Sequence, residues 1–247
     1  MNFDTVYIEE DTRNDKNTID ILGRIKFKNL IYCNSYSEIF NPQNQNFRIQ
    51  KIKPSIILAK KKENFIMNTP KDFTIGFKEN YYFSHMLNCI YDCKYCFLQG
   101  MFNSANFVVF TNFNDFINEI KKKALNKSHK LCFFSGYDCD SLALERITSF
   151  LKIFLKSFKE INNAYLEVRT KSCNIEVFKN IDPIENIIIA YSLNPDILVK
   201  EFEQKTPTLK KRIESAKFLQ ARGWKIGLRF DPLTDYKENK LIYKNFF

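Results

Sequence analysis

The segment NCIYDCKYC, residues 88–96, places three cysteines at the spacing C-x3-C-x2-C, with an aromatic residue just before the last of them. Iron–sulfur clusters are held by cysteine thiolates, usually four of them. Three clustered thiolates can therefore hold a four-iron cluster and leave one iron without a protein ligand. A metal centre with an open position can bind a substrate there, as catalytic zinc sites do. Cys89, Cys93 and Cys96 are thus the predicted cluster ligands.

Zinc binding is the alternative that the same cysteines leave open. Structural zinc normally has four protein ligands, and His85, four residues before Cys89, could supply the fourth. Disulfide bonding is disfavoured because the chain has seven cysteines, an odd number. The first residues also lack the basic segment and long apolar run of a secretory signal. We therefore expect a cytoplasmic protein with reduced thiols.

The composition is that of a chain with enough apolar residues for a large core. Hydrophobic residues make up 45% of the 247, and 25 are phenylalanine. No apolar run approaches the roughly 20 residues needed to cross a bilayer, so we expect no membrane partner. The net charge of +10 is compatible with a polyanionic partner. Lysine clusters such as 60–62 and 121–123 are nevertheless typical of solvated surface, so charge alone does not select nucleic acid.

The pattern of apolar residues changes at about residue 80. Residues 1–79 are predicted to form a small N-terminal αβ domain, and residues 80–247 a second domain in which strands alternate with helices. Strands are expected at 81–84, 106–110, 130–134, 164–169, 186–191 and 225–230, and helices at 113–125, 141–158 and 208–221. Such alternation indicates βαβ units and a parallel sheet. In barrels of this kind the site is built by loops at the C-terminal ends of strands, where the three cysteines fall.

Several segments, taken together, resemble the spore photoproduct lyase family of radical S-adenosylmethionine (SAM) proteins, especially its photolyase-like homologues. The matching residues are 80–101 around the cysteines and, in order along the chain, 47–51, 135–136, 140–145, 167–171, 192–195 and 229–233. The resemblance implies an α/β fold, with a partial (β/α)6-type radical SAM barrel and a small N-terminal αβ unit. It also implies a [4Fe-4S] cluster that reductively cleaves SAM to a 5′-deoxyadenosyl radical. The founding activity of the family is the repair of a thymine dimer in spore DNA.

The resemblance also assigns cofactor-binding residues. Lys171 and Ser192 correspond to residues that contact SAM, and Ser135 and Gly136 stand at a strand end with the same role. The chemistry agrees, because an ammonium can meet the SAM carboxylate as a point charge and a hydroxyl can both donate and accept. The family further implies damaged DNA as a partner and a flavodoxin- or ferredoxin-type electron donor.

The chain departs from the family next to the expected substrate position. The family's hydrogen-returning cysteine precedes the helix that corresponds to residues 141–158. Counting back from that helix places Tyr137 there, with Cys139 two residues away. Tyr95 precedes the third cluster cysteine as in the family, whereas Phe97 follows it and has no hydroxyl hydrogen to relay. Tyr95, Tyr137 and Cys139 are therefore the candidate hydrogen donors.

The family continues beyond residues 229–233 through a further strand–helix unit or two, whereas this chain ends at Phe247. The predicted barrel is therefore C-terminally incomplete and has an unpaired strand edge. Three functions stay open: a radical SAM lyase acting on damaged DNA, a radical SAM enzyme on another substrate, or a non-catalytic cluster-binding homologue. SAM cleavage separates the last from the others. Salt-dependent binding to damaged duplex DNA separates the first two.

Overall fold

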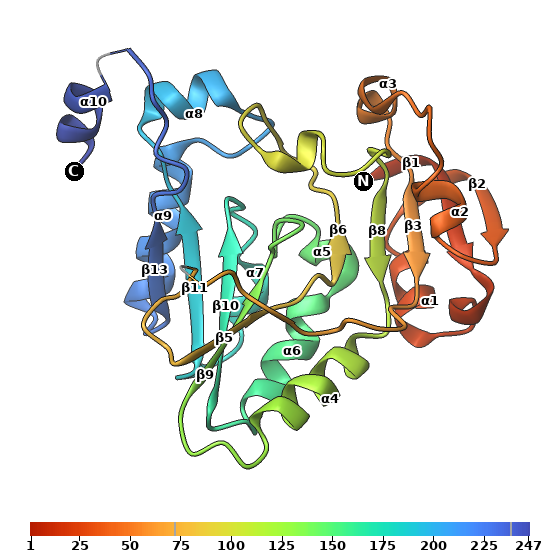
Figure 1. The fold of residues 1–247 in the computed structure, drawn as a ribbon, viewed down its shortest axis with the longest axis horizontal. Coiled ribbons are helices and arrows are strands. Elements are labelled where there is room, and N and C mark those ends of the chain that lie inside the picture. The colour runs from red at the N-terminus through yellow and green to blue at the C-terminus, as the bar shows by residue number, and fades with distance from the viewer. Residues whose placement is uncertain (72, 238) are drawn as a thin grey trace.

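The computed structural model describes residues 1–71, 73–237 and 239–247 and contains two large, mostly parallel sheets (Figure 1). The first sheet has the strand order β2-β1-β3-β8-β6, in which β6 runs antiparallel to β8. Its strands are β1 (Asn2–Glu9), β2 (Lys26–Cys33), β3 (Ile56–Ala59), β6 (Met86–Leu87) and β8 (Phe107–Phe110). The short helices η1 (Glu10–Thr12), α1 (Lys16–Leu22), α2 (Ser37–Phe40) and α3 (Phe47–Ile52) connect β1, β2 and β3.

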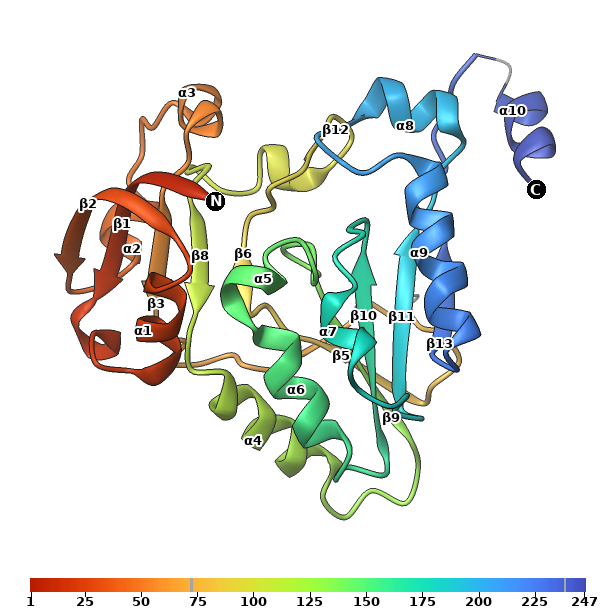
Figure 2. The ribbon, with the colours of Figure 1, turned by 180° about the vertical axis from the view of Figure 1, so that it is seen from behind.

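The second sheet is the partial barrel, with the strand order β13-β11-β10-β9-β5-β4. Its strands are β4 (Met67–Asn68), β5 (Glu79–Tyr82), β9 (Leu131–Ser135), β10 (Ala164–Thr170), β11 (Ile187–Ser192) and β13 (Lys225–Arg229). All pair in parallel except β4, which is antiparallel to β5. Helices lie on one face of this sheet, as the two opposite views show (Figures 1 and 2). The parallel βαβ architecture predicted for the second half of the chain is thereby confirmed.

The remaining elements cover the barrel or hold the cysteine loop. The helices are η2 (Phe97–Gln99), α4 (Phe113–Ala124), α5 (Glu145–Thr148), α6 (Phe150–Phe158), α7 (Glu176–Lys179), α8 (Asp196–Phe202), α9 (Leu209–Ala221) and α10 (Asn239–Phe246). Two short antiparallel strands, β7 (Asp92–Cys93) and β12 (Glu203–Gln204), pair with each other. None of the helices in the described part of the chain is long and apolar enough to cross a membrane.

A continuous apolar core explains why the two sheets stay together. Every residue of β3 and β8 is buried, as expected for strands that are covered on both faces. Phe83, which follows β5, packs on Phe116 of α4 and on Phe150 and Phe154 of α6, with ring centroids 5.3–6.1 Å apart. The same buried cluster includes residues from both sheets.

The prediction of one long helix over residues 141–158 is wrong, because the helix is interrupted at Ser149. This residue has the left-handed conformation (φ 49°, ψ 26°), which separates α5 from α6. The break lets the carboxylate of Glu145 accept hydrogen bonds from the backbone N–H groups of Leu151 and Lys152, at 2.8 and 3.1 Å. A carboxylate at a helix N-terminus satisfies free donors and complements the helix dipole. The spacing of apolar residues in this segment gives no indication of such a cap, so it could not predict the interruption.

The first sheet combines strands from both sides of the proposed boundary between residues 79 and 80. The predicted strand 106–110 is present as β8, but it pairs with β3 rather than with barrel strands. β6 then extends the same sheet. The division into 1–79 and 80–247 therefore stays a proposal, and the sheet pairing shows that the two parts are joined through shared strands.

Candidate functional site

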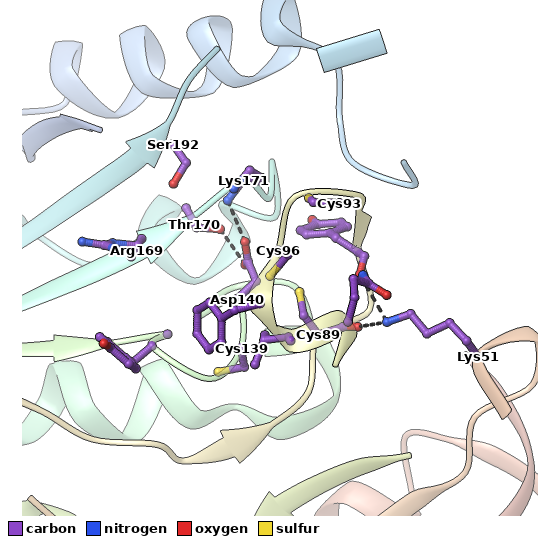
Figure 3. A pocket seen from close by; sticks show the side chains of 16 residues that line it. Lys51, Cys89, Cys93, Cys96, Cys139, Asp140, Arg169, Thr170, Lys171 and Ser192 are labelled. Carbon is purple, nitrogen blue, oxygen red and sulfur yellow. Dashed lines mark hydrogen bonds between the residues drawn. The ribbon is translucent and has the colours of Figure 1, made fainter. Parts of the chain in front are cut away.

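The C-terminal ends of the barrel strands and the cysteine loop surround one pocket (Figure 3). β9, β10 and β11 are parallel neighbours, so the residues that end them meet at one edge of the sheet. The lining residues are Lys51, Cys89, Tyr91, Cys93, Cys96, Phe97, Leu98, Gln99, Gly136, Tyr137, Cys139, Asp140, Arg169, Thr170, Lys171 and Ser192. Most of the residues singled out from the sequence are therefore brought together, whereas Tyr95 and Ser135 are not part of this lining.

The three motif cysteines line the pocket together and are unpaired by disulfides. Burial raises the pKa of the Cys89 thiol above its ordinary range and that of Cys93 to about 12. Buried thiols of this kind become thiolate ligands only when a metal displaces their protons. Within residues 1–71, 73–237 and 239–247, no three His, Cys, Asp or Glu side chains lie close enough together to hold a metal ion. The thiols thus share the pocket without converging on one point.

His85, the zinc ligand considered from the sequence, lies elsewhere. Its ring stacks on Phe150 with centroids 3.6 Å apart and planes 6° apart. Burial lowers its pKa to about 3, so the ring is neutral and acts as part of the apolar core. The pocket lining does not include it, and the structure gives the zinc alternative no support.

The cysteine loop is held by backbone contacts from a distant part of the chain. β7 pairs with β12, so Cys93 lies opposite Glu203. Directly after this pair, the N–H of Lys94 donates to the carbonyl of Phe202 at 2.8 Å. At the start of the loop, Asn88 has φ 68°, a conformation that asparagine tolerates better than most residues. These contacts fix the path of the loop before and between its cysteines.

A second contact to the loop comes from the N-terminal part of the chain. The ammonium of Lys51, on α3, donates to the carbonyl oxygens of Cys89 and Tyr91 at 2.9 and 3.4 Å. Figure 3 shows this side chain reaching across to the loop from the side opposite Lys171.

Tyr95 belongs to a buried network beside the pocket. Its hydroxyl donates to the carboxylate of Glu203, which also accepts from the amide of Asn194 at 2.9 Å. The Glu203 carboxylate forms an ion pair with Arg212, with Nη2 and Oε2 2.5 Å apart, and both side chains are fully buried. The ammonium of Lys171 lies 5.7 Å from the centre of the Tyr95 ring. Tyr95 is therefore fixed in place, with its hydroxyl hydrogen directed to Glu203.

Asp140 ties two strand ends together under the pocket. Its carboxylate accepts from the Thr170 hydroxyl at 2.7 Å and from the backbone N–H of Lys171 at 2.6 Å. It also accepts from the N–H groups of Leu142 and Ala143 at 3.0 and 2.9 Å. Three of these donors converge on Oδ1, and the Lys171 N–H reaches Oδ2. Burial still raises the pKa of Asp140. The residue acts as an anchor that positions the Lys171 backbone.

Gly136 makes room for this arrangement. It has φ 77°, and a Cβ added there would lie 2.5 Å from Ser141 Oγ and 3.0 Å from the carbonyl oxygen of Arg169. The preceding Ser135 is buried, and its hydroxyl bonds to Ser141 Oγ at 2.8 Å and donates to the carbonyl of Glu167 at 3.1 Å. Ser135 therefore supports the turn from inside the protein.

Replacing Gly136 by alanine should destabilise the protein by about 1–3 kcal/mol, because the new methyl group overlaps packed atoms in addition to the strained backbone. The midpoint of urea denaturation measures this loss. Gly76→Ala is the matched control, since Gly76 also has a positive φ, 91°, but nothing lies within 4 Å of an added Cβ. Equal losses in the two variants would show that the close packing at Gly136 does not matter.

The candidate hydrogen donors Tyr137 and Cys139 lie on the barrel side of the pocket. The Tyr137 ring stacks on Tyr82, with centroids 4.2 Å apart and planes 27° apart, and lies 6.2 Å from the ring of Phe97. Burial holds the pKa of Cys139 well above its ordinary value, so this thiol keeps its hydrogen.

Sequence reasoning gave no role to Lys51, Asp140, Glu203 or Arg212. The first two fall in the segments 47–51 and 140–145 that carry the family resemblance, which was the available signal. Glu203, directly after α8, and Arg212, within α9, showed no such signal, because charged residues in or beside helices usually face solvent. Only the fold shows that they are buried against each other.

Comparisons with known proteins agree with this arrangement. The sequence model of the family described as spore photoproduct lyase matches residues 77–247. A spore photoproduct lyase from Clostridium acetobutylicum is 24% identical over 167 residues, which cover 67% of this chain and 50% of that protein. One from Bacillus subtilis is 22% identical over 161 residues, covering 64% and 47%. The chain thus spans about half the length of the curated relatives it matches.

Solved structures show the same fold. A spore photoproduct lyase variant with bound AdoMet and dinucleoside spore photoproduct has a TM-score of 0.84 and 15% identity, covering 98% of this chain and 72% of that chain. A spore photoproduct lyase complexed with dinucleoside spore photoproduct gives a TM-score of 0.79 and 16% identity, with the same coverage. The likeness extends through both sheets, including the N-terminal part that precedes the matched residues of the family model.

Proposed function

This chain belongs to the spore photoproduct lyase family, and we propose that it is a radical SAM lyase that repairs thymine dimers in DNA. In this proposal Cys89, Cys93 and Cys96 hold a [4Fe-4S] cluster, and SAM binds beside it at the strand ends. The observation that carries the proposal is that one pocket is lined by all three thiols together with Lys171 and Ser192. Family membership supports the same assignment.

The donor set suits this group, because thiolates are the ligands that iron–sulfur clusters use and three of them leave one iron open. When bound, the cluster and SAM supply the one-electron chemistry that starts the repair. The chain supplies orientation and shielding. Asp140 fixes the backbone at Lys171, so that the Lys171 ammonium can meet the SAM carboxylate. Ser192, at the end of β11, offers a hydroxyl on the same side of the pocket.

For the return of hydrogen to the product, we propose Cys139 or Tyr137 in preference to Tyr95. Both line the pocket, and the raised pKa of Cys139 keeps its S–H intact. The hydroxyl of Tyr95 already donates to Glu203. Tyr95 remains a candidate only if that hydrogen bond breaks during turnover.

A DNA lesion is the substrate that the relatives favour, since solved spore photoproduct lyases contain dinucleoside spore photoproduct. The net charge of +10 supports binding to a polyanion. The ring of Tyr137, which lines the pocket and stacks on Tyr82, offers an aromatic surface for a base. A cytoplasmic location and a flavodoxin- or ferredoxin-type electron donor follow from the same proposal.

The test is anaerobic reconstitution with iron and sulfide, reduction with dithionite, and addition of SAM and dinucleoside spore photoproduct. We expect 5′-deoxyadenosine and repaired thymidine product, in which the bond joining the two thymines is broken and both glycosidic bonds are kept. Lys171→Met should weaken SAM binding roughly 10- to 100-fold, the effect of losing a charge-assisted contact of about 1.5–3 kcal/mol. Lys200→Met, which removes an exposed lysine paired with Asp196, should leave SAM binding unchanged.

Three outcomes would contradict parts of this proposal. A loaded cluster without 5′-deoxyadenosine would indicate a non-catalytic homologue. Release of 5′-deoxyadenosine without repair of the lesion to thymidine product would indicate a radical SAM enzyme with a substrate other than DNA. Equal SAM affinity of the Lys171→Met and Lys200→Met variants would remove Lys171 from the cofactor site.

A further inference from the structure

We propose that Lys51 is a positioning residue for the cluster: it fixes the cysteine loop from the N-terminal part of the chain and makes the cluster easier to reduce. The inference rests on the proposed function, because it requires that Cys89, Cys93 and Cys96 carry a cluster. It adds an N-terminal residue, outside the cysteine motif and the strand ends, to the groups that control that cluster.

The contacts of Lys51 are built into the structure. The side chain is half-buried and lines the pocket with the three cysteines. Two of its three N–H donors are used on the carbonyl oxygens of Cys89 and Tyr91. These carbonyls lie within the first turn of the loop, so the ammonium holds the backbone that carries the first cysteine.

The helix that carries Lys51 has few other attachments. No residue of α3 is buried, and Ile49 and Ile52 are 65% and 76% exposed. The neighbouring Gln50 accepts hydrogen bonds from Ser104 Oγ and from the N–H of Ala105, at 3.1 and 2.9 Å. Polar contacts to the cysteine loop and to the segment after it therefore position α3. Such a helix is arranged for those contacts rather than for apolar packing.

Lys51 is one of two half-buried lysines that line the pocket, and the other, Lys171, is assigned above to the SAM carboxylate. The lysines exposed beside the loop are different. Lys94 is exposed to solvent, and Lys205 is 54% exposed and pairs with Asp92 at 3.5 Å. Water and salt screen such charges effectively. A half-buried ammonium is screened less, so it acts more strongly on a neighbouring centre. Reduction adds one negative charge to a cluster, and a fixed positive charge beside the thiolates favours that reduced form.

The experiment is a redox titration of the cluster in the 247-residue chain, followed by electron paramagnetic resonance of the reduced form. In Lys51→Met, the ratio of reduced to oxidised cluster at a fixed potential should fall about tenfold, equivalent to about 59 mV for a one-electron couple. Lys51→Arg keeps the charge and should stay within about twofold of the wild type. Lys53→Met is the matched control, since Lys53 is exposed and pairs with Asp4 at 3.5 Å. Its potential should not change.

Amide hydrogen exchange on the protein without iron gives an independent readout. In Lys51→Met, the amides of residues 89–96 should exchange faster than in the wild type, whereas those of the barrel strands should not. If Lys51→Met fails to take up a cluster, faster exchange confined to residues 89–96, together with cluster uptake by Lys51→Arg, would support the inference. Faster exchange throughout the molecule, with loss of loading in both variants, would overturn it.

The outcomes separate this inference from the proposed function. A wild-type protein that binds no cluster would contradict the proposed function itself. A wild-type protein that binds a cluster, with an unchanged potential in Lys51→Met, would overturn only the role of Lys51.

Discussion

Replacing Cys93 by alanine should abolish both cluster binding and SAM cleavage. Cys93 lies on β7, is buried and lines the pocket, so its loss leaves two of the three motif thiols on the loop. The loop contains no other cysteine that could replace it. We therefore expect the iron content to fall from about four atoms per chain to background. Iron and sulfide analysis and chromatography for 5′-deoxyadenosine measure the two effects.

The control removes another buried cysteine that is remote from the pocket. Cys33→Ala changes the last residue of β2, in the first sheet, and deletes the same sulfur atom from a buried position. That variant should load iron and cleave SAM like the wild type. Retention of a full cluster by Cys93→Ala would mean that the three motif cysteines have been misassigned.

Replacing Glu203 by alanine should lower the free energy of unfolding by about 3–5 kcal/mol, because it leaves the Arg212 guanidinium buried without its counter-ion. Arg212 is fully inaccessible to solvent. Its N–H groups donate to the carbonyls of Pro207 and Ser192 and to the Thr206 hydroxyl, at 2.9, 3.0 and 2.7 Å. The guanidinium therefore cannot turn to water without breaking those bonds. Chemical denaturation measures the loss.

Two comparisons make this prediction specific. The double variant Glu203→Ala, Arg212→Met should lose less than the sum of the single variants, since neither charge is then left alone. Asp196→Ala breaks an exposed pair with Lys200 and should cost less than about 1 kcal/mol. If Glu203→Ala also lowers the free energy of unfolding by less than about 1 kcal/mol, the buried pair is not important for stability.

The same ion pair gives a pH dependence. Burial acts to raise the pKa of Glu203, but the nearby Lys171 and Arg212 outweigh burial and lower it below its ordinary value of 4.5. A carboxylate with a lowered pKa stabilises the folded state above its unfolded pKa. The stabilisation should therefore be complete above about pH 4.5 and be lost as the pH falls further, an effect that Glu203→Ala removes.

The sequence predicted the parts of the fold that depend on local pattern. The strands that end near Ser135, Lys171 and Ser192 were foreseen from apolar runs, and the cysteine spacing located the pocket. Long-range pairing was not foreseeable in the same way. Glu203 and Arg212 meet only because β12 and α9 pack against the end of β11, and neither residue differs locally from a surface charge. The break at Ser149 depends likewise on a side-chain cap that periodicity does not encode.

The pairing of β7 with β12 has a consequence for the order of assembly. β12 begins at Glu203, more than a hundred residues after Cys93 along the chain. During synthesis, the cysteines leave the ribosome long before the segment that fixes their loop. The α3 contact, by contrast, comes from residues already made. If the cluster binds as proposed, we expect iron to enter a correctly shaped loop only after β12 has been made, so cluster loading would be a late step of assembly.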